Sequence, residues 1–100
     1  MNKRLKARCY KALELFVPAA RAICGKEGVA ITMDNIRFWQ AYDDPAWQEA
    51  VLDLTLDTGA ETAMRLWDIM SEQLDINTVD DKVRYAIGLC IHWERRDDGQ

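Results

Sequence analysis

A long apolar stripe near the N-terminus constrains the fold of this chain more than any other feature. Between residues 3 and 24 the apolar side chains recur every three or four positions, as they do along one face of an α-helix. Pro18 lies inside the stripe, and proline removes a backbone donor and clashes with the preceding turn, so we expect a kink or break there. Gly25 and Gly28 then end the helix, because glycine accepts the left-handed conformation.

Capping signals predict further helices along the rest of the chain. Thr32 can cap one helix, Asp44 followed by Pro45 can start another, and Thr58 with Glu61 has the spacing of a capping box. The expected helices span about residues 3–24, 33–42, 45–56, 60–74 and 79–95. The sequence therefore predicts an all-α fold, a compact single-domain bundle of about five helices over residues 1–100, with residues 1–4 and 97–100 frayed.

The apolar positions of these helices predict the core. Only the segment 29–31 is a short apolar connector that could be strand-like. The expected core consists of Leu13, Phe16, Val17, Ile36, Trp39, Trp47, Val51, Leu54, Met64, Trp67, Met70, Val83, Ala86, Ile87 and Cys90.

The cysteines and the N-terminal segment bear on location. Three cysteines are an odd number without a CxxC pair, which favours reduced, buried thiols over a disulfide framework. The basic N-terminus imitates a secretory signal, but Glu14 and Arg21 interrupt its apolar region. No apolar run approaches the roughly 20 residues of a membrane span. We therefore expect a cytoplasmic protein that makes no membrane contact.

The charges are segregated along the chain. The formal net charge is −4, yet five basic residues precede the first acidic one, and residues 34–81 hold twelve acidic residues against two arginines. Glu49, Asp53 and Asp57 repeat every four positions and would line one helix face. Glu61, Asp68 and Glu72 form a second acidic set. Both sets fit solvated helix faces; both also fit an acidic surface that occupies a basic groove.

The basic segment from Lys3 to Lys11 opposes the dipole of the helix that it begins. A phosphate backbone, an acidic protein partner or the chain's own acidic residues could compensate. Its basic residues do not share one face, so pairing within the protein or in a homodimer is at least as well supported as nucleic-acid binding.

Motifs for catalysis are missing from the sequence. His92 is the only histidine and Ser71 the only serine, and neither has a motif around it. On a helix Cys90 and His92 would point about 200° apart, which argues against a Cys–His pair or a shared metal. No nucleotide-phosphate loop occurs. We therefore expect no enzyme activity, no catalytic residues, no metal and no cofactor.

A helix-turn-helix alternative depends on residues 52–70, where a glycine turn separates two predicted helices. Its second helix is acidic, so phosphates would repel it and direct nucleic-acid binding is not expected. Aromatic residues off the main apolar stripes are candidate interface anchors instead. These are Phe38, Tyr42 and Trp93.

In size, acidity, predicted helix content and lack of a catalytic motif, the chain resembles the small acidic proteins that bacteriophages encode to inhibit host machinery, including anti-CRISPR proteins. The resemblance implies a non-enzymatic inhibitor in the bacterial cytoplasm that sterically blocks a basic, nucleic-acid-handling complex. The partner-binding residues expected on that basis are Glu49, Asp53, Asp57, Glu61, Asp68, Glu72, Phe38, Tyr42 and Trp93. The alternative is a helical homodimer or adaptor, and a less favoured one is the helix-turn-helix regulator.

Overall fold

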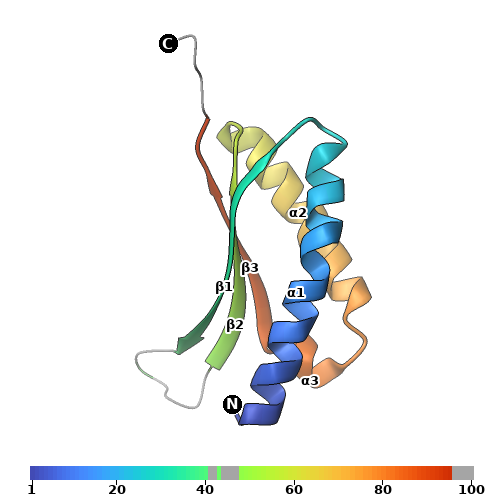
Figure 1. Cartoon of the computed structure of the whole chain (residues 1–100), viewed down its shortest axis with the longest axis vertical. Helices are drawn as coiled ribbons and strands as arrows, with labels where there is room; N and C mark the ends of the chain where they lie inside the picture. Colours follow the sequence, from blue (N-terminus) through green and yellow to red (C-terminus); the bar gives the residue numbers. More distant parts are fainter. Residues whose placement is uncertain (41–42, 44–47, 96–100) are drawn as a thin grey trace.

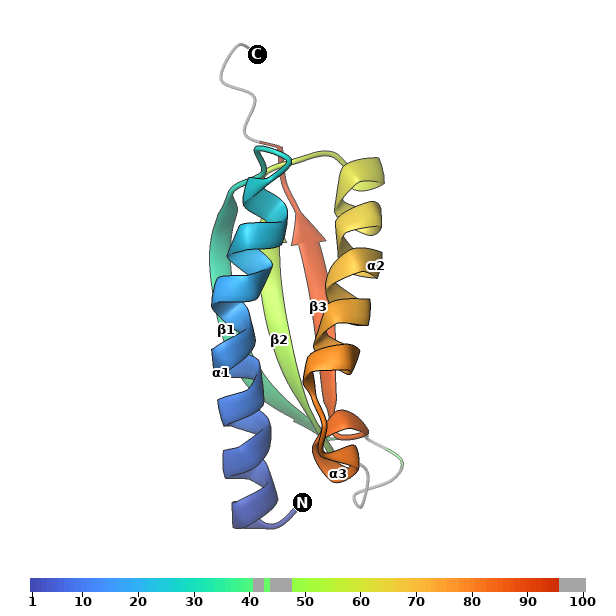
Figure 2. The same ribbon diagram turned by 90° about the vertical axis from the view of Figure 1, so that its right-hand side faces the viewer.

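Two long helices lie side by side on one face of a three-stranded sheet (Figures 1 and 2). The structure is a computed structural model that describes residues 1–40, 43 and 48–95. Helix α1 spans Lys3–Gly25 and helix α2 spans Ala60–Asn77. The predicted first helix is therefore confirmed, and it runs through Pro18 without a break. A short helix, α3 (Asp81–Arg84), precedes the last strand.

The sheet is mixed. Strand β1 (Ile31–Gln40) pairs antiparallel with the central strand β2 (Gln48–Leu56), and β2 pairs parallel with β3 (Ile87–Trp93). A parallel neighbour requires the chain to cross back over the sheet. Helices α2 and α3 make that crossing (Figure 2).

The apolar pattern of β2 explains why it is a strand. Leu52, Leu54 and Leu56 are fully buried, and the residues between them, Asp53 and Thr55, are only half-buried. This alternation has the period of two that places successive side chains on opposite faces of a sheet. The even-numbered positions face the helices, and the odd-numbered positions face away from them.

The prediction of an all-α bundle is wrong. The segments expected as helices over residues 33–42, 45–56 and 79–95 contain β1, β2 and β3 wherever the structure describes them. The helix-turn-helix alternative fails for the same reason, because residues 52–56 belong to the central strand. The expected restart at Asp44 and Pro45 lies outside the described residues.

The helix ends differ in part from the expected caps. Asn2 caps α1 by accepting a hydrogen bond from the Leu5 amide at 2.7 Å, and Asp80 caps α3. Gly59 occupies the cap position of α2 and supplies no side chain, so the capping box expected from Thr58 and Glu61 is not formed. Gly28, at φ +70°, takes the left-handed conformation after α1.

The core lies between the two helices and the face of the sheet that carries Leu52, Leu54 and Leu56. Helix α1 contributes Cys9, Leu13, Phe16, Ala20 and Cys24, and α2 contributes Ala63, Leu66, Met70 and Leu74. The core prediction is confirmed for Leu13, Phe16, Leu54, Met70, Val83 and Ala86, which belong to this core; Val51 is also buried, but it lies on the opposite face of the sheet. It is wrong for Trp39, Met64 and Trp67, which are exposed.

Two further residues predicted for the core, Cys90 and Trp47, are not among its described members. Cys90 is half-buried on the face of the sheet that points away from the helices, and Trp47 lies outside the described residues. All three cysteines are free, and Cys9 and Cys24 are buried as expected. Burial raises the pKa of both of these thiols above the ordinary value.

None of the described helices combines the length and apolar character needed to cross a bilayer.

Candidate functional site

One face of the sheet carries no covering element among the described residues, as the edge-on view in Figure 1 shows. Cross-strand neighbours share a face, so the pairings Trp39↔Glu49, Arg37↔Val51 and Asn35↔Asp53 place the odd-numbered side chains of β1 and β2 here. The pairings of β2 with β3 add Gly88, Cys90 and His92. We call this surface the open face.

Four polar side chains from three strands meet near the middle of the open face. Asp53 lies on the central strand, with Arg37 on one neighbouring strand and Cys90 and His92 on the other. His92 Nε2 is 3.5 Å from Asp53 Oδ1 and 3.8 Å from Cys90 Sγ. One ligand atom from each of Asp53, Cys90 and His92 lies within 4.8 Å of the other two.

Asp53 is much less exposed than its neighbours Arg37 and His92. Its side chain is only 16% exposed, and Arg37 Nε donates to its Oδ2 at 2.5 Å. This ion pair raises the pKa of Arg37. The second oxygen, Oδ1, is buried and has no hydrogen-bond donor among the described residues. A buried carboxylate oxygen without a donor is costly, so the arrangement favours an additional positive ligand at that atom.

Cys90 shares this environment. Burial raises the pKa of its thiol, the neighbouring Asp53 carboxylate raises it further, and the Arg37 guanidinium opposes both effects. The thiol is therefore protonated at neutral pH when no cation is bound nearby.

The expectation that Cys90 and His92 point apart is wrong. It requires both residues to lie on a helix, where two positions correspond to about 200°. They lie on β3 instead, and residues two apart on a strand project from the same face. The two side chains therefore approach one another.

The contacts do not form a Cys–His–Asp catalytic relay. In such a relay the nucleophile uses one imidazole nitrogen and the carboxylate orients the ring through the other. Here the thiol and the carboxylate both approach Nε2. The three donor atoms instead lie close enough to one another that they could hold a cation.

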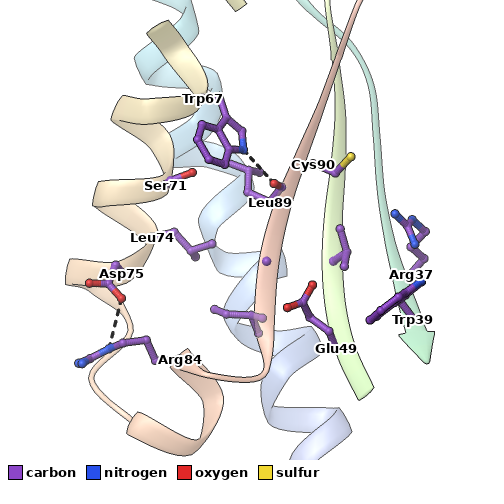
Figure 3. Close-up of a pocket in the computed structure, with 13 residues that line it drawn as sticks. Arg37, Trp39, Glu49, Trp67, Ser71, Leu74, Asp75, Arg84, Leu89 and Cys90 are labelled. Carbon is purple, nitrogen blue, oxygen red and sulfur yellow. Dashed lines mark hydrogen bonds and ion pairs between the residues drawn. The ribbon is translucent and has the colours of Figure 1, made fainter. Parts of the chain in front are cut away.

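A hollow of about 520 Å³ wraps around the outer edge of β3. Figure 3 shows Trp67, Ser71 and Asp75 from α2 on one side of β3, and Glu49 and Cys90 on the other side. The strand itself separates the two groups. Trp67 Nε1 donates to the Leu89 carbonyl at 2.9 Å and so occupies one backbone acceptor of this free edge. The hollow therefore does not bring Ser71 together with Cys90.

The expected acidic residues fall on two opposite sides of the molecule. Glu49 and Asp53 lie on the open face, and Asp57 directly follows the same strand. The second set projects from α2, which covers the other side of the sheet, and all three of its members are exposed: Glu61, Asp68 and Glu72. The structure therefore does not join the six carboxylates into one surface.

The expected aromatic anchors are also dispersed. Phe38 lies on the helix side of β1, where the Lys6 ammonium stands 5.6 Å from the centre of its ring. Trp93 is on the helix side of β3 by alternation with His92, and Tyr42 lies outside the described residues. Trp39 was expected in the core, but it is 43% exposed on the open face. Only a strand assignment could have identified it as an anchor.

The basic N-terminal segment finds acidic partners within the chain. Arg8 pairs with Asp80, and Lys11 Nζ lies 3.7 Å from Glu14 Oε1. Of the three partners considered from the sequence, the chain's own carboxylates are thus observed for these two residues.

Comparison with known proteins adds no relative: no protein-family model, no curated protein and no solved structure matches this chain.

Because Asp53 is more buried than Asp34, the Arg37–Asp53 ion pair should contribute more to stability than the Arg21–Asp34 ion pair. Replacing Arg37 with glutamine should lower the free energy of unfolding more than the same change at Arg21, because it leaves a mostly buried carboxylate without its charged donor. Replacing Arg21 with glutamine should cost less than about 1 kcal/mol, because its partner Asp34 is 38% exposed. Urea unfolding of both variants measures the difference, and equal losses would contradict this account of Asp53.

Proposed function

We propose that this chain is a non-enzymatic protein-binding protein and that the open face of its sheet is the binding surface. The observation that carries the proposal is that both long helices lie on one side of the sheet, and none of the described residues covers the other side. A partner would supply the missing layer.

The side chains of the open face suit a protein partner. Trp39 offers a large aromatic surface, and tryptophan is among the residues that most often dominate binding energy at interfaces. It stands directly opposite Glu49 in the pairing of β1 with β2. An exposed aromatic residue beside a carboxylate provides an apolar anchor next to a charge that selects a basic neighbour.

The charge of the chain supports a basic partner. Glu49 has no ion pair among the described residues, and the net charge of −4 favours association with a positive surface. Small size and acidity also support the narrower proposal of a phage-type, anti-CRISPR-like inhibitor. Such a protein would occupy a basic surface of a nucleic-acid-handling complex in the bacterial cytoplasm and block it sterically.

A pull-down from nuclease-treated bacterial lysate, with four matched variants, tests this proposal. Trp39→Ala should weaken capture of the recovered protein by about 30-fold, the effect of losing a hot-spot residue, and Glu49→Lys should also weaken it. Met64→Ala and Glu72→Lys are the controls, because both alter exposed residues of α2 on the opposite side. The proposal fails if the α2 variants lose binding and the open-face variants keep it.

A homodimer is the second candidate, because the open face carries both signs of charge, Arg37 and Glu49, and could pair with its own copy. A mass measurement in solution separates the candidates. A dimer that Trp39→Ala dissociates supports this second candidate, and a monomer at micromolar concentration excludes it.

A further inference from the structure

We propose that Asp53, Cys90 and His92 form a zinc-binding site on the open face of the sheet. The inference goes beyond the proposed function and does not depend on it, since all three donors belong to this chain.

The two donor separations that involve His92 are close to those of tetrahedral zinc, and all three donor atoms lie within 4.8 Å of one another. With Zn–N of about 2.0–2.1 Å, Zn–S of about 2.3 Å and tetrahedral angles, the nitrogen and sulfur of two ligands stand about 3.6 Å apart. The same geometry places a nitrogen and a carboxylate oxygen about 3.3 Å apart. The observed separations are 3.8 Å for His92 Nε2 and Cys90 Sγ, and 3.5 Å for His92 Nε2 and Asp53 Oδ1. The His92 side chain is 58% exposed, so its ring has room for the small adjustment.

The types of donor also select zinc. A thiolate, an imidazole and a carboxylate are the three side chains that zinc sites use, and the sulfur disfavours magnesium and calcium, which take oxygen ligands. Three protein ligands leave a fourth tetrahedral position, which a water molecule or a donor from a ligand can fill. Coordination converts the Cys90 thiol to a thiolate and releases its proton to solvent.

The surroundings of Asp53 orient it for this role. Arg37 holds Oδ2, which leaves Oδ1 directed toward His92 without a donor of its own. Hydrogen bonds of this kind to a ligating carboxylate are typical of zinc sites, where they fix the ligand's orientation. A zinc ion would give the buried Oδ1 atom, which accepts no hydrogen bond of ordinary length, a cation in direct contact.

The test is a titration of the full-length, reduced, metal-free protein with zinc against a chromophoric chelator, in the absence of any partner. We expect one ion per chain. Cys90→Ser and His92→Gln should each weaken binding by more than about 100-fold, since even the loss of an outer-shell contact costs 10- to 100-fold. Glu49→Gln is the matched control, because it removes a carboxylate of the same face that lies outside the cluster.

Cobalt provides an independent readout. Substitution of cobalt should give a thiolate-to-metal charge-transfer band that Cys90→Ser abolishes and Glu49→Gln retains. His92 is the only histidine, so its imidazole signals in an NMR spectrum should shift on addition of zinc. Circular dichroism shows that each variant is folded. Absence of stoichiometric binding by the folded wild type, or unchanged affinity in Cys90→Ser and His92→Gln, would overturn the site.

Discussion

Replacing Leu54 with alanine should lower the free energy of unfolding by about 2–5 kcal/mol. Leu54 is fully buried at the centre of β2, between the sheet and the two helices. Truncation removes apolar contacts and leaves a cavity that a strand bonded on both edges cannot close by shifting. Urea unfolding followed by circular dichroism measures the loss.

Leu15→Ala is the matched control for this variant. Leu15 belongs to α1 but is 65% exposed, so the same chemical change should alter the free energy of unfolding by less than about 0.5 kcal/mol. Comparable losses in the two variants would mean that Leu54 does not lie in the core described here.

Zinc should raise the melting temperature by about 10–20 °C when its free concentration is 100 times the dissociation constant. A ligand that binds only the folded state then adds about 2.7 kcal/mol, and each kcal/mol shifts the midpoint of a domain of this size by about 4–8 °C. The three donors come from β2 and β3, so the unfolded chain does not hold them together. Differential scanning calorimetry with and without a chelator measures the shift.

The His92→Gln variant separates this effect from nonspecific stabilisation by metal ions. Its melting temperature without zinc should match that of the wild type, because the His92 side chain is exposed. With zinc it should stay unchanged, whereas the Glu49→Gln variant should still be stabilised. Equal stabilisation of His92→Gln and the wild type would show that zinc acts elsewhere.

The helical part of the fold was predictable from the sequence, because α1 and α2 keep their apolar residues in step with 3.6 residues per turn over many turns. The sheet was not predicted. Four positions are close to one helical turn and are also an even number, so Glu49 and Asp53 share a face in either structure. A spacing of four therefore could not distinguish helix from strand.

A spacing of two residues does distinguish a strand from a helix in this sequence. Leu52, Leu54 and Leu56 alternate with Asp53 and Thr55, which is the pattern of a half-buried strand. Gly88 gave a similar signal, because glycine weakens the interior of a helix. In β3 an added Cβ at this position would stand 2.9 Å from Glu49 Oε1, so glycine lets the Glu49 side chain lie across the neighbouring strand.

The candidate site was only partly accessible to sequence reasoning. The charge pattern predicts Asp53 as a binding residue, whereas the expected helical geometry wrongly places Cys90 and His92 far apart. Arg37 carried no local signal, because its partner Asp53 is brought to it by the antiparallel register of β1 and β2. Residues joined across strands become neighbours only through the fold, so their chemistry has no sequence motif.

The parallel pairing of β2 and β3 has a consequence for the order of folding. Strands β1 and β2 are neighbours in the chain, whereas β3 reaches β2 only after α2 and α3 have been placed. Contacts that close a long loop are made at a higher entropic cost and form slowly. We therefore expect the contacts of Asp53 with Cys90 and His92 to form late in folding, and a cation bound by all three would stabilise the pairing of β3 with β2.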